Sequence, residues 1–394
     1  MSAGPSSLPT IRLLRPLDRV ARLGHPWVYR DALEGALPSP GTLVDLTFKD
    51  DFVARGYLDG GPIGVRLLTT LKEPLDLNFF RRRLMAAAEL RRTVLPKDTD
   101  AFRLVNGEGD RLPGVVCDVY GAYAVLRFDS PGARLLLPKL ESSLIQVLRE
   151  FGVQNLLVRA GRGAGRTLEV RAGTLPEDSI SVRECGMTLL VDLVHGQKTG
   201  MFLDHRDSRA LVRRLSEGGR VLNLYGYTGG FSIAAGLGGA FEVVTVDAAP
   251  AAIDLALRAW QLNGLSPKNH QGIAADVPSF LRQAESSREY FDFIIADPPS
   301  FAPREAAKDA ALEVYAQLHR SCVERLRPGG MYLAASCSSH VDRHAFLETV
   351  VEAGRRLSRV LQVLGCWGAA SDHPFLTAFP EGDYLKSILV RPVF

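Results

Sequence analysis

The hydrophobic pattern of the C-terminal half indicates a parallel β-sheet covered by helices. Four short runs are apolar throughout and are typical of buried strands, at Arg220–Leu224, Glu242–Val246, Phe291–Ala296 and Met331–Ala335. Between and around them lie stretches with helical spacing of apolar residues, at about Phe231–Gly236, Ala249–Asn263, Val277–Ala284 and Ala306–Leu326. Strands that are apolar on both faces must be covered on both sides, and parallel strands need crossover helices. The pattern therefore predicts an α/β domain.

The N-terminal half has a different pattern, which predicts two further domains. Up to about Thr70, strand-like runs are separated by turns rich in Gly and Pro, at Thr42–Phe48, Phe52–Leu58 and Gly64–Leu68, and a small β-barrel is their natural packing. A helix at Leu75–Val94 is then followed by strands and a second helix, at Val115–Tyr120, Tyr123–Phe128, Leu135–Phe151 and Asn155–Arg159. We therefore predict a β-barrel domain at 1–71, a central α+β domain at 72–186 and the α/β domain at 187–394.

Composition and charge exclude several classes of protein. Of 394 residues, 46% are hydrophobic and 23% are charged, as in ordinary globular domains. The net charge of +3 does not by itself demand a nucleic acid partner. No apolar run reaches the roughly 20 residues of a membrane helix, and Met1–Pro9 lacks the features of a signal peptide, so we expect no membrane partner. The five cysteines include no CxxC pair, so we expect no metal site and a reduced, cytoplasmic protein.

A glycine-rich loop follows the first apolar strand and predicts a nucleotide-like ligand. This loop, Tyr225–Gly230 (YGYTGG), joins the strand to the next helix. Open α/β sheets bind ligands at the carboxyl ends of their strands, and glycines let the backbone approach a ligand closely. Asp247 ends the second strand, where an acid can accept hydrogen bonds from ribose hydroxyls. Singly, the loop can be a tight turn and Asp247 a helix N-cap, so the prediction rests on their order along one sheet.

Three details favour S-adenosylmethionine over a nicotinamide dinucleotide. The loop is not GxGxxG, so it fits a pyrophosphate poorly. Asp276 follows the next short apolar run and can meet an adenine amine. A further strand ends in Asp297-Pro298-Pro299-Ser300-Phe301, a rigid corner that presents a carboxylate to an exocyclic amine of a planar base. Phe301 can stack on that base. Together these details predict methylation of a base.

Cys337 is the candidate nucleophile. It follows the Met331–Ala335 strand, so we expect it in the same cleft as Asp297. Carbon 5 of cytosine is a poor nucleophile, and its methylation needs a thiolate that adds at C6, whereas N-methylation of a purine needs no cysteine. The alternative is a buried cysteine that acts as a small hydrophobic residue. We interpret the other four in that way, namely Cys117, Cys185, Cys322 and Cys366.

Several motifs resemble those of the bacterial PUA-containing large-subunit ribosomal RNA 5-methylcytosine methyltransferases (the RlmI, or YccW, family). In the C-terminal half they are His195–Arg206 (HGQKTGMFLDHR), Leu222–Phe231 (LNLYGYTGGF), Asp297–Phe301 (DPPSF), Ser336–Ser338 (SCS) and Glu381–Lys386 (EGDYLK). Gly24–Tyr29 (GHPWVY) is similar to the start of their PUA domain, and Arg103–Asp110 (RLVNGEGD) is similar to the signature of their central domain. The resemblance extends over nearly the whole chain.

The resemblance implies a PUA RNA-binding domain, a central α+β domain and a Rossmann-like methyltransferase domain that uses S-adenosylmethionine. It implies that Cys337 attacks cytosine C6 and that Asp297 holds the base, beside Pro298, Pro299 and Phe301. The residues expected at the cofactor are Lys198, Phe202, Asp204, Arg206, Asn223, Tyr225, Tyr227, Thr228, Gly229, Asp247, Asp276 and Asp297. Another class of RNA cytosine methyltransferases has a second cysteine where this chain has Pro299, so a two-cysteine mechanism is excluded.

Basic residues add a prediction about the partner. Lys198, His205, Arg206 and Arg209 place positive charge near the cleft edge, suited to a phosphate or to the cofactor carboxylate, unless they form a solvated face at the start of a helix. Further clusters lie at Arg12, Arg15, Arg19, Arg22 and Arg30 around Trp27 and Tyr29, at Arg81–Arg83, at Arg91–Arg92, and at Arg159, Arg162 and Arg166. Each alone is typical of a solvated surface, but together they favour RNA, and the resemblance implies ribosomal RNA.

Two other functions stay open at this point. One is N-methylation of a purine in ribosomal RNA, with the same fold and cofactor. The other is a ribosome assembly factor that binds RNA without turnover. A nicotinamide dehydrogenase is disfavoured by the glycine spacing. The oligomeric state also stays open, with a homodimer as one option.

Overall fold

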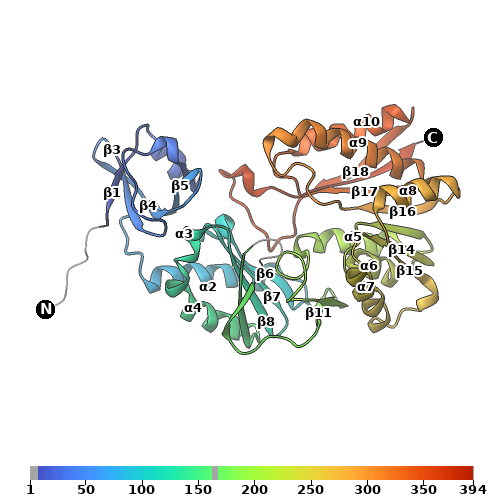
Figure 1. Cartoon of the computed structure of the whole chain (residues 1–394), viewed down its shortest axis with the longest axis horizontal. Coiled ribbons are helices and arrows are strands. Elements are labelled where there is room, and N and C mark those ends of the chain that lie inside the picture. The colour runs from blue at the N-terminus through green and yellow to red at the C-terminus, as the bar shows by residue number, and fades with distance from the viewer. Residues whose placement is uncertain (1–7, 162–166, 394) are drawn as a thin grey trace. The chain divides into compact units, whose positions relative to one another are not determined.

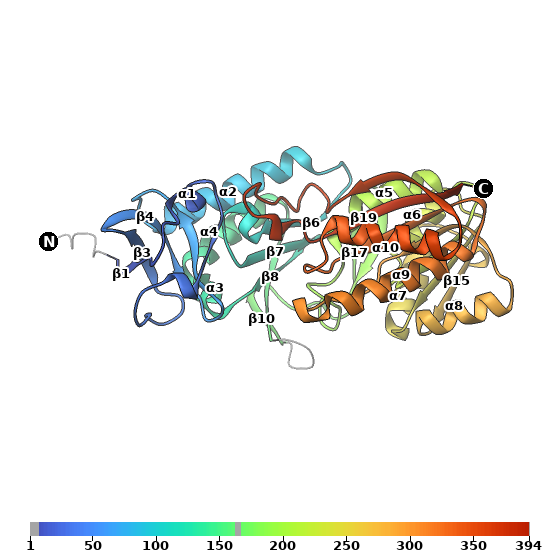
Figure 2. The same cartoon turned by 90° about the horizontal axis from the view of Figure 1, so that it is seen from above.

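The computed structural model describes residues 8–161 and 167–393 (Figures 1 and 2). The chain forms two compact units, which we describe separately. Unit 1 comprises Met1–Leu95, Asp100–Glu177 and Ser371–Gly382, and unit 2 comprises Pro96–Thr99, Asp178–Ala370 and Asp383–Phe394. Across the described residues, none of the helices has the length and apolar character that crossing a bilayer requires.

Unit 1 begins with a five-stranded sheet around a small apolar core. Its strands, in the order in which they lie side by side, are β1 (Thr10–Arg12), β3 (Leu43–Phe48), β4 (Asp51–Leu58), β5 (Ile63–Thr69) and β2 (Trp27–Tyr29), with the short helix α1 (Asp18–Arg22) after β1. Val44, Leu46 and Val65 are fully buried in this core. The three strands expected in this region are present, each within one residue of its predicted bounds.

A second five-stranded sheet in unit 1 carries its remaining helices. The strands, in spatial order, are β10 (Thr167–Ala172), β9 (Asn155–Ala160), β8 (Tyr123–Phe128), β7 (Val115–Tyr120) and β6 (Ala101–Asn106), and the helices are α2 (Leu77–Val94), α3 (Pro131–Arg134) and α4 (Leu137–Glu150). Asp76 caps α2, because its carboxylate accepts a hydrogen bond of 2.9 Å from the Phe79 backbone N–H. The predicted apolar face of α2 is buried at Phe79, Phe80, Leu84, Ala87 and Ala88.

The loop after β6 neutralises two buried arginines of unit 1. Residues Gly107–Asp110 form a 3-10 helix there. Glu108 accepts a hydrogen bond of 2.5 Å from Arg66, and Asp110 pairs at 2.5 Å with Arg91, whose side chain is fully buried. A buried guanidinium that loses its carboxylate is strongly destabilising. The Arg103–Asp110 motif therefore has a structural role in unit 1.

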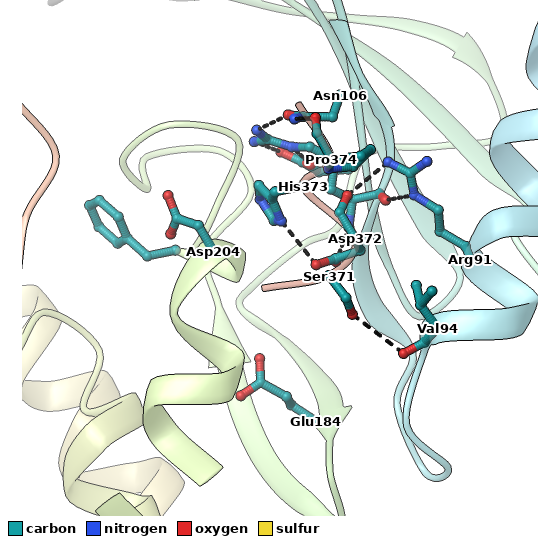
Figure 3. A network of polar contacts seen from close by, with 12 residues as sticks. Arg91, Val94, Asn106, Glu184, Asp204, Ser371, Asp372, His373 and Pro374 are labelled. Carbon is teal, nitrogen blue, oxygen red and sulfur yellow. Dashed lines mark hydrogen bonds and ion pairs between the residues drawn. The ribbon is translucent and has the colours of Figure 1, made fainter. Parts of the chain in front are cut away.

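Residues Ser371–Gly382, hereafter the strap, lie between two strands of unit 2 in sequence but pack within unit 1 (Figure 3). Arg91 donates a hydrogen bond of 2.7 Å to the backbone oxygen of Asp372, and Asn106 donates one of 2.8 Å to the backbone oxygen of Pro374. Gly109 lies against the strap, since a Cβ at this position would come within 1.8 Å of the Pro374 oxygen. The loop that neutralises the arginines thus also holds the strap.

Unit 2 is built on a seven-stranded sheet. The strands, in spatial order, are β15 (His270–Ala274), β14 (Glu242–Asp247), β13 (Arg220–Leu224), β16 (Phe291–Ala296), β17 (Leu326–Ser336), β19 (Lys386–Val393) and β18 (Val360–Trp367). The first five are parallel, and β19 runs antiparallel to both of its neighbours. A separate two-stranded hairpin, β11 (Ile180–Glu184) and β12 (Met187–Val191), precedes the sheet in sequence.

Helices cover both faces of the seven-stranded sheet (Figures 1 and 2). One layer holds α5 (Arg206–Leu215), α6 (Gly230–Leu237) and α7 (Pro250–Leu262), and the other holds α8 (Val277–Ser286), α9 (Lys308–Glu324) and α10 (Arg343–Arg356). Phe280, Tyr315 and Phe346, from the three helices of the second layer, share one core with Val244 and Ile294 of the sheet. This confirms the predicted Rossmann-like α/β fold.

The sequence pattern missed the antiparallel edge formed by β18 and β19, together with α10. β18 is an edge strand whose apolar side chains lie largely in solvent, and Val360 is 71% exposed. A strand of this kind lacks both the alternation and the continuous burial that mark a strand in sequence. The division of the chain into domains at 71/72 and 186/187 stays a prediction.

We predict that replacing Gly109 by Ala destabilises the chain by about 1–3 kcal/mol, because the new Cβ would clash with the Pro374 backbone and push the strap away. Gly61→Ala is the matched control, since a Cβ at that position would have no atom within 4 Å. Urea denaturation of both variants measures the difference. Equal stability of the Gly109 and Gly61 variants would contradict the close approach of the strap.

Candidate active site

Four parallel strands of unit 2 end at the same edge of the sheet. Their pairing places Leu224 of β13 beside Val246 of β14 and Ala296 of β16, and Ala296 beside Ala334 of β17. The chain order reverses between β13 and β16, which is the switch point where open α/β sheets bind ligands. The loops that follow these four strands therefore meet around one space.

A cavity of about 290 Å³ lies at this edge. The predicted site residues that line it are Lys198, Phe202, Asp204, Tyr225, Tyr227, Thr228, Asp247, Asp297, Pro298, Pro299 and Cys337. His205, Phe231 and Leu385 are among the other residues of its wall. The fold thus brings the glycine loop, both strand-end acids and the candidate nucleophile to a single cavity.

The glycine loop is fixed by backbone hydrogen bonds. Tyr225 and Tyr227 have positive φ angles of 57° and 46°, a conformation that costs energy for residues with a side chain. The Tyr227 N–H donates a hydrogen bond of 2.9 Å to Asp247. A Cβ at Gly226 would come within 2.5 Å of the Thr245 side chain, so only glycine fits there. Asp247 therefore shapes the loop in addition to facing the cavity.

Tyr227 and Asp204 tie the His195–Arg206 motif to the cavity wall. The Tyr227 hydroxyl accepts a hydrogen bond of 2.8 Å from the Gln197 N–H and donates one of 3.1 Å to the Gly200 carbonyl. The Asp204 carboxylate accepts hydrogen bonds from Lys198 (3.1 Å) and from the Tyr384 hydroxyl (2.7 Å). Lys198 is thus paired with Asp204 rather than free in solvent.

Asp297 is held by a histidine whose pairing the sequence did not predict. His205 Nε2 lies 3.1 Å from Asp297 Oδ2, and the His205 side chain is only 2% exposed. Within the described residues, no hydrogen-bond partner faces the other ring nitrogen, Nδ1. This short contact holds the Asp297 carboxylate against the imidazole ring. The two residues are far apart in sequence, so only the fold reveals the contact.

Cys337 lies among charges of both signs. Burial raises the pKa of its thiol above the usual range, and the negative charges of Asp297 and Asp204 add to the rise. The positive charges of Lys198 and Lys386 act in the opposite direction. The two lysines are thus the groups that favour the reactive thiolate.

Five of the predicted site residues do not line the cavity. Three of them lie behind the residues of the cavity wall. Arg206 and Asn223 are buried, and a Cβ at Gly229 would come within 2.6 Å of Ala256 in α7. Asp276 is exposed and caps α8 through the Ser279 N–H at 3.1 Å. The roles that we predicted for these residues stay predictions.

Phe301, the fifth, packs inward instead. Its ring centroid lies 4.9 Å from that of Tyr315, and the ring joins the core of unit 2. The Tyr315 hydroxyl also hydrogen-bonds to Ser338 at 2.9 Å, next to Cys337. Phe301 therefore supports the loop that carries the cysteine, and its predicted stacking on a base stays a prediction.

The basic group at the cleft edge is less exposed than we expected. Arg209 is buried and forms a bidentate pair with Glu184 at 2.6 and 2.5 Å, and Arg206 is also buried. His205 is buried and lies 3.1 Å from Asp297. Lys198 is the one of the four that keeps substantial exposure, with 36% of its side chain accessible. The alternative of a solvated basic face is therefore wrong for His205, Arg206 and Arg209.

The arginine clusters of unit 1 divide into exposed and buried residues. The cluster that consists of Arg12, Arg15, Arg19, Arg22 and Arg30 is exposed throughout, as are Tyr29, Arg81, Arg82 and Arg92. Arg91 and Arg159 are buried, and Arg162 and Arg166 lie outside the described residues. Trp27 packs against Phe379 of the strap at 4.6 Å between ring centroids and donates a hydrogen bond to Glu108. Trp27 is therefore part of the packing of unit 1.

Sequence reasoning gave no role to three consecutive residues, Tyr384, Leu385 and Lys386. The Glu381–Lys386 motif entered only as part of the resemblance. In the structure, Tyr384 binds Asp204, Leu385 lines the cavity and Lys386 acts on Cys337. Recognition of the apolar run that forms β19, directly after these residues, would have indicated that they lie at the sheet edge.

The chain matches two protein families and has close relatives of known name. Residues 163–363 match the family described as S-adenosylmethionine-dependent methyltransferase, and residues 11–70 match the PUA-like domain. The chain is 36% identical over 372 residues to Ribosomal RNA large subunit methyltransferase I of Cronobacter sakazakii, over 92% of this chain and 94% of that protein. The protein of the same name from Aeromonas salmonicida is 36% identical over 390 residues, 97% of this chain and 98% of that protein.

Solved structures with the same fold are also known. A putative methyltransferase from Streptococcus mutans has a TM-score of 0.86 at 24% identity, over 98% of this chain and all of that one. A putative methyltransferase complexed with SAH gives the same TM-score, identity and coverage. At this identity the likeness shows the fold alone.

A buried chain of hydrogen bonds joins the strands and the helix that flank the glycine loop. Asn223 donates to Ser232 (2.8 Å), Ser232 bonds to Thr245 (2.6 Å), and Thr245 bonds to His270 Nε2 (2.7 Å). The Trp260 ring stacks on His270 at 4.4 Å. Burial lowers the pKa of His270 to about 4. The imidazole is therefore neutral at pH 7 inside the folded unit.

This predicts a loss of stability in mild acid. The pKa of His270 is lower in the folded chain than in the unfolded chain, so the unfolded chain takes up the proton first as the pH falls below about 6.5. The resulting loss is about 2 kcal/mol between pH 7 and pH 5. His270→Phe, which keeps a ring beside Trp260, should remove this part of the pH dependence in urea denaturation.

The wild type, measured in urea at the same pH values, serves as the reference for that measurement. If the His270→Phe variant loses as much stability between pH 7 and pH 5 as the wild type, the predicted contribution of His270 to the pH dependence is wrong.

Proposed function

The chain belongs to the family of S-adenosylmethionine-dependent methyltransferases that includes the ribosomal RNA large subunit methyltransferases I. On this basis, we propose that it methylates carbon 5 of a cytosine in large-subunit ribosomal RNA. The observation that carries the cytosine chemistry is the presence of Cys337 and Asp297 in one cavity with the glycine loop. A purine N-methyltransferase needs no nucleophilic thiol beside the acid that holds the base.

The residues of the cavity fit S-adenosylmethionine, which supplies a methyl group on a sulfonium. Phe202, Tyr225 and Phe231 offer aromatic walls for a planar base and an apolar chain. Asp247 stands at a strand end, where it can accept hydrogen bonds from ribose hydroxyls. Asp204 adds negative charge that suits the sulfonium or an ammonium.

We assign the cofactor to the cavity-lining residues Lys198, Phe202, Asp204, Tyr225, Tyr227, Thr228, Asp247 and Asp297, with Arg206, Asn223 and Gly229 shaping the wall from beneath. Asp276 is kept as a contact for the adenine amine. Pro298 and Pro299 form the rigid corner beside the target base.

Cys337 and Asp297 divide the chemistry between them. The Cys337 thiolate adds to C6 of cytosine, and the electron pair of the C5–C6 double bond makes C5 nucleophilic toward the methyl group. Asp297 accepts a hydrogen bond from the exocyclic amine and is oriented by His205 at 3.1 Å. After transfer, a base takes the C5 proton, the electron pair of the C5–H bond re-forms the C5–C6 double bond, and the Cys337–C6 bond breaks to release the thiolate.

The exposed arginines of unit 1 support RNA as the partner. Arg12, Arg15, Arg19, Arg22 and Arg30 lie in or beside the region that matches the PUA-like domain. Guanidinium groups at a surface contact phosphates, and the exposed Tyr29 can stack on an unpaired base. A target base inside a duplex would have to be extruded, so a single-stranded or loop target suits the cavity.

We predict that Cys337→Ala lowers the methylation rate roughly a thousandfold or more, because C5 is no longer activated. The control is Cys366→Ala, since Cys366 is exposed on β18 and does not line the cavity. Methyl transfer to ribosomal RNA from a strain without the gene, followed by nucleoside mass spectrometry, measures both the rate and the position of the methyl group.

A second readout uses RNA that contains 5-fluorocytosine, from which the fluorine at C5 cannot leave as a proton does. The wild type and Cys366→Ala should form an adduct stable to denaturing electrophoresis, and Cys337→Ala should form none. A product methylated on a purine nitrogen, or full activity of Cys337→Ala, would refute the proposed chemistry.

A further inference from the structure

Lys386 is a buried lysine that binds the loop carrying Cys337. It is the first residue of β19, and its pairing partner across the sheet is Ser336, the residue before the cysteine. The Lys386 ammonium donates hydrogen bonds to the backbone oxygens of Ser338 (2.6 Å) and Tyr384 (2.8 Å). The residue is only 1% exposed. Lys386 thus pairs with the residue before Cys337 and hydrogen-bonds to Ser338, the residue after it.

The charge of Lys386 has no carboxylate partner within ion-pair distance among the described residues. The charged groups that act on it are Cys337, Asp383, Arg343 and Asp342. Asp383 is paired with Arg343 at 3.0 Å, and Asp342 caps α10 through the Ala345 N–H at 2.8 Å. An ammonium buried beside carbonyls alone is costly, and burial lowers the pKa of Lys386 to about 8.

Lys386 differs in this respect from the other cation beside the thiol. Of the two lysines, Lys198 has the larger effect on the pKa of Cys337. It is paired with Asp204 at 3.1 Å and is partly in solvent, so Asp204 and water offset part of that effect. The field of Lys386 acts in a buried environment without a paired carboxylate, where an interaction between charges is stronger. Asp297 and Asp204 oppose it, because both disfavour a thiolate.

We propose that Lys386 is the positioning residue of the nucleophile: it holds the Ser338 carbonyl and favours the thiolate form of Cys337. The thiol proton passes to water in the cavity, and the ammonium and the thiolate then stabilise one another. This inference rests on the proposed function only in taking Cys337 as the nucleophile. A purely structural lysine would cap the two carbonyls without affecting the titration of the thiol.

The test is the pH dependence of Cys337 alkylation in the full-length protein, without cofactor or RNA. Iodoacetamide labelling between pH 6 and pH 10 is followed at each cysteine peptide by mass spectrometry. In K386Q, which keeps two N–H donors without the charge, labelling of Cys337 at pH 7, where Lys386 is charged, should slow about five- to tenfold, and the difference from the wild type should shrink above pH 8 as Lys386 loses its proton. K386M should show the same slowing, and K386R should stay within about twofold of the wild type at pH 7.

The exposed Cys366 provides a control in every sample, and its labelling profile should be the same in all variants. Thermal unfolding reports the structural effect separately, and K386Q carries the test if K386M fails to fold. A K386Q profile at Cys337 that superimposes on the wild type, with only the melting temperature lowered, would overturn the proposal. Since labelling needs neither cofactor nor RNA, failure here is distinct from failure to find 5-methylcytosine.

Discussion

The register between β13, β14 and β16 is the constraint on which the site depends. These strands are apolar throughout, and Leu222, Val244 and Ile294 are fully buried between two layers of helices. A slip of one residue would move a strand end by about 3.3 Å against its neighbour. That displacement would break the 2.9 Å hydrogen bond between the Tyr227 N–H and Asp247. Burial of the strands thus sets the positions of the polar residues that follow them.

Charge compensation then separates the groups at the site by role. Arg209 is fully matched by Glu184, and Lys198 by Asp204, so both fix backbone segments around the cavity. The Asp297 carboxylate lies 3.1 Å from the His205 ring, which holds it in place. Lys386 donates hydrogen bonds to two carbonyl oxygens, and it has no carboxylate within ion-pair distance among the described residues. An interaction with the thiolate of Cys337 would offset part of the cost of burying its charge.

The sequence was sufficient for features that depend on one stretch of chain. The glycine loop, Asp247, Asp297 and Cys337 each follow an apolar run, and the rule that ligands bind at strand ends places them together. The contacts between distant stretches could not be predicted in this way. Tyr384 reaches Asp204 across 180 residues, and Arg209, which has the pattern of a surface helix residue, is buried against Glu184 of the preceding hairpin. Such pairs depend on the packing of whole elements.

The antiparallel strand β19 has the largest consequence among the features that the pattern missed. Lys386 is the first residue of β19, and Tyr384 and Leu385 directly precede it, so three neighbours contact different parts of one site. Tyr384 binds Asp204, Leu385 lines the cavity, and Lys386 binds the Ser338 carbonyl. Because β19 pairs with β17, this short segment lies beside the strand that ends at Ser336. The segment that leads into the antiparallel strand therefore adds Leu385 to the wall of the cavity and places Lys386 beside Ser336, the residue before the nucleophile.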